Sequence, residues 1–212
     1  MGSAHPARNR VTPRGDIIAV AGRGAWMGNR GRLHEGSGTR DIVRNHQTKA
    51  WITCALEFKG WRAPQWAPNH YTPLFFTDEA VALAAGHRPC AECRRADYNG
   101  YRRAWAETHG GTLPSAKEMD ARLHRERTDP TECRMPWETL PDGVFVETHD
   151  GPAVVAGDHL AVWDARDYTY RHQLPRPVTG FAEVLTPPST VAVLQAGYPV
   201  QIDHRARLLP ER

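Results

Sequence analysis

A pair of cysteines separated by two residues is the clearest chemical signal in the chain. Cys90 and Cys93 lie in the run Gly86-His-Arg-Pro-Cys-Ala-Glu-Cys-Arg-Arg95. Because glycine and proline favour a turn here, we expect both sulfurs to point at one tetrahedral ion, with zinc–sulfur bonds of about 2.3 Å. Thioredoxin-like redox sites share the C-x-x-C spacing, but here the pair follows a Gly-x-x-Pro turn and not a strand. The spacing therefore predicts a zinc site.

The residues before this pair carry a longer similarity. Residues 74–93 read Leu-Phe-Phe-Thr-Asp-Glu-Ala-Val-Ala-Leu-Ala-Ala-Gly-His-Arg-Pro-Cys-Ala-Glu-Cys. An aromatic strand, a capped alanine-rich helix and G-x-R-P-C-x-x-C in this order resemble the second half of the zinc-binding domain of the bacterial Ada alkylation-repair protein and its relatives. The likeness covers residues 72–95. It implies a domain that binds one zinc through four cysteines, docks on DNA and uses a metal-bound thiolate to accept a methyl group from an alkylated phosphate.

The chain departs from that family at the upstream ligands. The family has a C-x-x-x-C pair there, whereas this chain offers only Cys54, with Phe58 in the second position. The methyl-acceptor chemistry is therefore not carried over. Cys54, Cys90 and Cys93 need a fourth ligand to complete a structural site, and His34 is the preferred candidate because it would give a Cys₃His set. The other candidates are His46, His70, Cys133 and, less suited because it holds the family's aromatic position, His87.

A missing fourth ligand also describes a catalytic zinc. Such an ion keeps one position for a water molecule, whose pKa falls to about 7. A proton carrier would then be needed nearby, and Glu57, Glu92 and His124 are candidates. Two or three thiolates are more typical of structural zinc, so we favour a structural ion and keep the catalytic one as the alternative.

Basic residues are concentrated near the N-terminus. Residues 1–50 carry nine basic and three acidic side chains, whereas residues 111–150 carry five basic and nine acidic ones. This asymmetry favours a polyanion that approaches the N-terminal half. The glycine-rich run 22–31 offers backbone N–H groups to a phosphate, and guanidinium groups grip phosphate well. Together with the resemblance, this predicts DNA as the partner, contacted by Arg23, Arg30, Arg32, Arg94 and Arg95.

The front half must supply the elements that position these residues. Apolar runs predict strands over 16–21, 51–58 and 74–76. Thr77 is a good N-cap for a helix that ends at Gly86, and Ser115 begins a capping box for a helix that continues to about residue 127. On that helix, His124 and Arg127 share one face, which suits an acid–base group beside an anion as well as ordinary surface pairing.

A further helix is predicted over 95–107. It aligns three aromatic side chains in one stripe, which we expect to pack in the core and not to stack on bases. The three are Tyr98, Tyr101 and Trp105.

The sequence pattern changes after Pro130. Short β-rich runs, separated by Asp-Gly and Gly-Asp turns, predict a small meander or barrel with one helix over 188–196. In it, Trp163, Tyr168 and Tyr170 either line a groove or plug a barrel. The predicted strands are 144–147, 153–155, 160–163, 182–185 and 200–202.

These elements predict an α+β fold. We expect a flexible segment over 1–15, an Ada-like zinc-knuckle α+β region over 16–130, and a β-rich region over 135–212. No apolar stretch approaches the roughly 20 residues that span a bilayer, and no charged-then-apolar leader opens the sequence. Four cysteines in 212 residues are too few for a disulfide scaffold. We therefore expect a cytoplasmic protein without a membrane partner.

Three functional hypotheses follow. The first is a zinc-binding protein that binds or acts on DNA, in repair or modification. The second is a zinc-dependent enzyme, of hydrolase or nuclease type, acting on nucleic acid or on a small molecule. The third is a zinc-stapled module that binds another protein. The sequence leaves open whether the protein is an enzyme and what its oligomeric state is.

Overall fold

The computed structural model describes residues 5–35, 40–128 and 133–208. Within these ranges, the first sheet has the strand order β2-β1-β5-β3-β4-β6. The β1–β5 and β4–β6 pairs are parallel and the other pairs are antiparallel. The strands are β1 (Arg8–Val11), β2 (Ile17–Ala19), β3 (Trp26–Asn29), β4 (Ile52–Cys54), β5 (Leu74–Phe76) and β6 (Arg88–Pro89).

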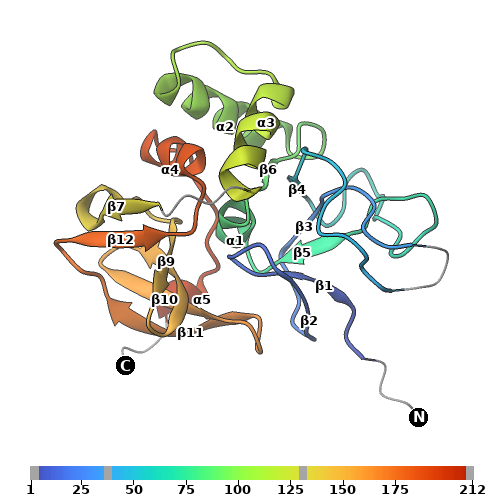
Figure 1. Ribbon diagram of the computed structural model, residues 1–212, viewed down its shortest axis with the longest axis horizontal. Helices are drawn as coiled ribbons and strands as arrows, with labels where there is room; N and C mark the ends of the chain where they lie inside the picture. Colours follow the sequence, from blue (N-terminus) through green and yellow to red (C-terminus); the bar gives the residue numbers. More distant parts are fainter. Residues whose placement is uncertain (1–4, 36–39, 129–132, 209–212) are drawn as a thin grey trace.

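The second sheet is antiparallel throughout, with the order β11-β10-β9-β8-β12-β7. Strands β8 to β11 form the expected meander, and β12 returns to pair with β8. Figure 1 shows this sheet in yellow to red beside the blue-to-cyan first sheet, with α1 between them. Its strands are β7 (Arg134–Pro136), β8 (Phe145–Thr148), β9 (Gly151–Ala156), β10 (His159–Asp164), β11 (Thr169–Pro175) and β12 (Phe181–Val184).

Both faces of the second sheet are buried. Val144, Val146 and Val155 point to a core that also contains side chains of the helices. Phe145 and Val154, the alternate residues, point to a core that includes α1 and the first sheet. Because successive side chains of a strand point to opposite faces, burial on both faces requires continuous apolar runs, as in β9. The two halves of the chain therefore share a hydrophobic core.

Helix α1 (Glu79–Ala84) is buried along its whole length. Asp78 caps it: one carboxylate oxygen accepts from the Val81 N–H, and the other accepts from the Tyr170 hydroxyl and the Asp203 N–H. The structure thus shifts the cap by one residue from the expected Thr77, whose hydroxyl contacts Trp163. Gly86 ends this segment with φ = 80°, a conformation that favours glycine.

The remaining helices are α2 (Arg95–Thr108), α3 (Ala116–Thr128), α4 (Pro188–Gln195) and the short α5 (Arg205–Leu208), with a 3₁₀ turn at Trp137–Thr139. Of these helices, α2, α3 and α4 lie close to the predicted ranges, whereas α5 was not predicted. The capping box at the start of α3 forms, since Ser115 and Glu118 exchange hydrogen bonds. The aromatic stripe of α2 is buried in the core, as expected. In the described part of the chain, no helix is both long and apolar enough to cross a membrane.

Three expectations about the elements are wrong. Residues 8–11 form β1, with Val11 fully buried, so this stretch of the supposedly flexible N-terminus is part of the sheet. The glycine-rich run 22–31 contains β3, which pairs with strands on both sides. Residues 200–202 form no strand, because the Gln201 backbone instead bonds to Glu79 and Ala80 at the start of α1.

Strand β11 was not predicted, because its buried positions include polar residues. His172 bonds to Asp150, and Gln173 bonds to His159 and to the Ala206 carbonyl oxygen. The aromatic residues before and within it, Tyr168 and Tyr170, are core residues and not groove-lining ones. The Tyr168 hydroxyl bonds to the Val11 backbone in the first sheet, so it connects the two halves.

The second sheet begins near the expected boundary at residue 135, but helices α2 and α3, which precede it in the sequence, pack in the same core as this sheet. The sheets occupy separate parts of the sequence, up to Pro89 and from Arg134. The shared core of α1 and the second sheet nevertheless joins them. Each sheet thus comes from its own part of the sequence, but one hydrophobic core joins the two sheets.

Asp78 generates a prediction about pH. Complete burial raises the pKa of this carboxyl group to about 6, although three hydrogen bonds favour its ionised form. A raised pKa in the folded state means that stability is greatest below the unfolded value of 3.8 and is lost as the pH rises through 6. Relative to Asp78→Asn, the wild type should lose roughly 2 to 3 kcal/mol of unfolding free energy between pH 4 and pH 7. Urea denaturation of both proteins at several pH values measures this difference, and parallel pH profiles would contradict it.

Candidate metal centre

Three cysteines meet beside the first sheet. The sulfur atoms of Cys54, Cys90 and Cys93 all lie within 4.8 Å of one another. A tetrahedral zinc with bonds of 2.3 Å places its sulfur ligands about 3.8 Å apart, so the three positions suit such an ion. Thiolates are soft ligands that favour zinc over hard cations such as magnesium or calcium. The donor set therefore fits the predicted metal.

Strand pairing explains why these sulfurs converge. Cys54 is the last residue of β4, which runs parallel to β6. Cys90 directly follows β6, so a short strand does precede the pair, contrary to the sequence-based expectation. The Cys90 N–H donates to the Thr53 carbonyl oxygen at 2.9 Å. A turn then brings back Cys93 just before α2 begins. The local pairing of β4 with β6 thus brings a cysteine 36 residues upstream to the C-x-x-C pair.

The β6 strand is itself fixed to the helical layer. The Arg88 guanidinium makes two hydrogen bonds, of 2.8 and 2.9 Å, to the Asp120 carboxylate of α3. Both side chains are almost completely buried. A two-point pair of this kind holds its partners in a defined orientation. The turn that carries Cys90 and Cys93 therefore begins at a rigidly held strand.

The three thiols differ in acidity. The Cys54 thiol donates toward the other two sulfurs, which together with burial raises its own pKa. The same contact lowers the pKa of Cys90 to about 5, helped by the Glu92 N–H, which points to the sulfur at 3.4 Å. The Cys54 contact also lowers the pKa of Cys93. The centre thus favours thiolates, and a cation would take the place of the Cys54 proton.

The surroundings of the centre are mostly apolar. Met27, Ile52 and Phe75 pack against the cysteines, while Cys93 is partly exposed. Tyr71 lies close to the sulfurs: burial raises the pKa of its phenol most, and the three cysteines add to the shift. Nothing in the sequence pattern indicated Tyr71. Glu57, a candidate proton carrier, is instead exposed and paired with Arg62.

His34 is not brought to the centre. Its ring is buried, with Nδ1 at 2.7 Å from the Thr72 hydroxyl and Nε2 at 3.2 Å from the Ala67 carbonyl oxygen. Both ring nitrogens are therefore engaged elsewhere, and the ring packs edge-on against Trp66. In this structure His34 acts as a packed core histidine.

The alternative fourth ligands are also elsewhere. Among the described residues, the metal-ligating group contains the three cysteines alone. His70 is exposed and bonds to a neighbouring carbonyl oxygen, and His87 is fully buried against Phe76 and Trp51. His46 and Cys133 line a separate cleft.

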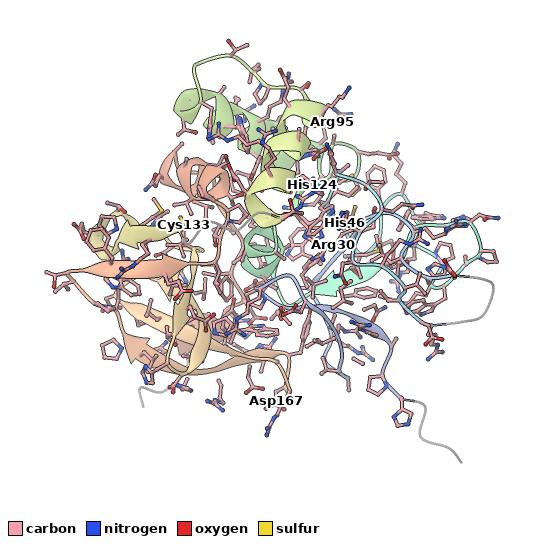
Figure 2. The ribbon with its side chains drawn as sticks, in the orientation of Figure 1. Arg30, His46, Arg95, His124, Cys133 and Asp167 are labelled. Atoms are coloured by element: carbon pink, nitrogen blue, oxygen red, sulfur yellow. The ribbon has the colours of Figure 1, made fainter. Side chains whose placement is uncertain are left out.

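The predicted DNA-contacting arginines do not form one surface. Arg94 is buried: it bonds to Glu79 at 2.6 Å and to Asp97 at 2.9 Å, and it covers the Trp26 ring. Arg30 is buried as well. Figure 2 shows Arg95 and Arg30 well apart, with Arg95 near the upper part of α3 and Arg30 below it, beyond His124 and His46. The exposed members of the predicted set are Arg23, Arg32 and Arg95.

The glycines of residues 22–31 serve close packing. A Cβ atom on Gly28 would lie 2.2 Å from the Ile52 carbonyl oxygen of the neighbouring strand. One on Gly22 would lie 2.2 Å from the Tyr168 Cβ. No side chain fits at these distances. The glycine content therefore reflects contacts within and between the sheets, and the predicted phosphate loop is wrong for the part that forms β3.

Comparisons with known proteins identify no relative of this chain. No family model, no curated protein and no solved structure matches the chain. The similarity of residues 72–95 to the Ada zinc-binding domain therefore stays a prediction.

The position of Arg94 makes its role testable. Replacing it with methionine would leave the Glu79 carboxylate buried without its cation, which costs about 3 kcal/mol even though other donors remain. Arg95→Met, next along the chain and exposed, should change the unfolding free energy by less than about 0.5 kcal/mol. Urea denaturation of both variants checks this. The double variant Glu79→Gln/Arg94→Met should recover part of the stability that Arg94→Met loses. If Arg94→Met and Arg95→Met lower the unfolding free energy equally, Arg94 has no structural role.

Proposed function

We propose that the protein binds one zinc ion through Cys54, Cys90 and Cys93, and that the ion is structural. The observation that carries this proposal is the convergence of three sulfurs within 4.8 Å from two separate segments. Such an ion ties the end of β4 to the turn before α2. Three thiolates give zinc a net negative site, which weakens it as an activator of water and suits a structural role.

The fourth position is the chemically interesting one. Because the metal-ligating group in the described residues consists of three cysteines, an exogenous ligand or water completes the tetrahedron in this proposal. The partly exposed Cys93 marks the side from which such a ligand enters. An exchangeable position is also what a zinc enzyme requires, and this arrangement is the basis of that alternative.

Metal analysis tests the site. Protein purified without a metal-binding tag should contain about one zinc per chain, and Cys54→Ser, Cys90→Ser and Cys93→Ser should each lose most of it. Cys133→Ser is the matched control, because this cysteine lies outside the group, and it should keep the metal. Cobalt in place of zinc should show the absorption of a tetrahedral thiolate site.

The same variants separate the two roles. If zinc is structural, chelation and Cys54→Ser should both lower the melting temperature, because metal binding is coupled to folding. A variant that stays as stable as the wild type but loses an activity would instead indicate a chemical role. Protein free of metal after purification would overturn the whole proposal.

DNA is proposed as a second candidate partner. The specific support is the excess of basic residues over 1–50 and the exposure of Arg23, Arg32 and Arg95. Contacts from such side chains to phosphates release counterions, so affinity falls with salt. The buried Arg94 takes no part in this proposal.

A salt titration tests this partner. The affinity for duplex DNA should fall with rising salt, and Arg23→Gln, Arg32→Gln and Arg95→Gln should each reduce the slope of log K against log salt by about 1. The exposed Arg166, on the β10–β11 connection of the other half, supplies the control Arg166→Gln, which should leave the slope unchanged. A slope near zero for the wild type would remove phosphate contacts from the proposal.

A further inference from the structure

A cleft of about 850 Å³ lies where the two halves of the chain meet. Its walls come from the β1–β2 turn, the loop before β4, the C-terminal ends of α1 and α3, and the residues of and after β12. In Figure 2, Arg30, His46 and His124 lie near one another beside α3, with Cys133 on the side of the second sheet. A cleft of this volume is in the range of small-molecule sites.

Two arginines flank the tryptophan in this cleft. The guanidinium carbons of Arg30 and Arg127 each lie 3.8 Å from the ring centre of Trp51. Two guanidinium groups at that distance cannot share one face of an indole, so they occupy its two faces. Trp51 thus holds two positive charges in fixed positions at the cleft wall.

Among the described residues, no carboxylate forms an ion pair with Arg30 or Arg127. Arg30 donates to the Gly15 carbonyl oxygen and to His87, and Arg127 donates to the carbonyl oxygens of Gly86 and Lys49. Carbonyl oxygens satisfy hydrogen bonds but do not neutralise a charge. Arg30 Nη2 and Arg127 Nε are buried and have no hydrogen-bond partner in the part of the chain that the structure describes.

The buried positions of Arg30 and Arg127 destabilise their charged forms, as their lowered pKa values indicate. Burial, followed by repulsion from Arg127, lowers the pKa of Arg30 to about 9. Burial lowers the pKa of Arg127 to about 9 as well. Both remain positively charged at neutral pH. Two buried like charges of this kind are stabilised by an anion.

Two histidines lie close to Arg127: His46 lines the cleft, and His124 contacts His46 and Arg127. The rings of His46 and His124 lie 5.1 Å apart, and Arg127 Nη2 is 3.4 Å from His124 Nδ1. Burial and then Arg127 lower the pKa of both imidazoles, and Lys49 adds to the effect on His124. At neutral pH both rings are neutral and each keeps one N–H to donate.

The described acidic groups near the cleft do not neutralise Arg30 and Arg127. Asp120, which faces Arg127, is held by Arg88. Glu126 accepts from Arg122 and from the Ser189 N–H. Asp16 and Glu183 also line the cleft, and Asp16 acts on Arg30 from a distance without forming an ion pair.

We propose that this cleft binds a terminal phosphate group, gripped by Arg30 and Arg127 and by the imidazoles of His46 and His124. A phosphomonoester is a dianion with three terminal oxygens, which matches two cations and two neutral donors better than the single charge of a carboxylate or an internal phosphodiester. The remaining volume of the cleft holds the organic part of the ligand. This inference does not depend on zinc.

Inorganic phosphate is the first probe. Titrated into the protein as purified at constant ionic strength, it should bind saturably, with a Kd below about 1 mM. Because a dianion favours the protonated imidazole, phosphate should also raise the pKa of His46 and His124, as followed by NMR. Absence of saturation up to about 10 mM, or unchanged histidine pKa values, would overturn the proposal.

Variants locate the binding. His46→Ala and Arg127→Gln should each weaken phosphate binding at least about tenfold, whereas the exposed Arg166→Gln should leave it within about twofold. His46 is exposed and its removal should not affect folding, so His46→Ala decides the outcome even if Arg127→Gln is unstable. Binding to His46→Ala with the wild-type Kd would count against the site.

Oligonucleotides distinguish the sources of the phosphate. A 5′-phosphorylated single strand should bind at least about tenfold more tightly than its 5′-hydroxyl counterpart of the same sequence, and a nucleoside 5′-monophosphate shows whether a free phosphomonoester suffices. Equal binding of the two single strands would mean recognition of internal diesters. That result would favour the DNA proposal made above and overturn this one.

Discussion

Two buried carboxylates at the start of α1 hold distant parts of the chain together. Glu79 accepts hydrogen bonds from Arg94, from the Tyr198 hydroxyl and from the Gln201 N–H. Asp78 accepts from Tyr170, in the second sheet, and from the segment after α4. Carboxylates in an interior are costly unless all their oxygens are satisfied. Because their donors come from three separate segments, α1 fixes the relative position of the sheets and of the turn before α2.

The proposed metal centre is coupled to this network through the backbone. Arg94 follows Cys93 directly, and its guanidinium reaches Glu79. On the other side, Arg88 precedes the cysteine pair by two residues and is held by Asp120. The C-x-x-C turn therefore lies between two buried ion pairs, each with its partner on a different helix or helix end. In this chain the arginines around the cysteines organise the fold, which is why a DNA-facing interpretation of Arg94 was wrong.

The sequence could predict the elements whose signals are local. Helix α2 carried an aromatic stripe and α3 a capping box, and the C-x-x-C pair gave two of the three converging sulfurs with Cys54 as the third. Other features depended on contacts that no local pattern encodes. Strand β11 is polar because His172 and Gln173 find partners in distant segments. Val200 and Ile202 suggested a strand, but the Gln201 backbone between them bonds to the start of α1 and not to a neighbouring strand.

The sequence was also misleading where one residue type can serve either in ligand binding or in packing. Glycines at 22–31 suggested a phosphate loop, yet the close approach of strands needs them. His34 had the right chemistry for a ligand, yet its two nitrogens are bonded in the core. The sequence indicated the cleft around Trp51 at one point only, where His124 and Arg127 share a face of α3. Its other members, Arg30 and His46, come from loops whose meeting place only the fold determines.

The Asp78–Asp203 hydrogen bond joins residues 125 positions apart, and this separation has a consequence for the order of synthesis. A ribosome adds about 5 to 20 residues per second, so α1 waits roughly 6 to 25 s for its last partners to emerge. During that interval its apolar residues and the two carboxylates at its start lack their native surroundings. The nascent chain is therefore dependent on its own C-terminal residues, or on a chaperone, to escape association with other chains.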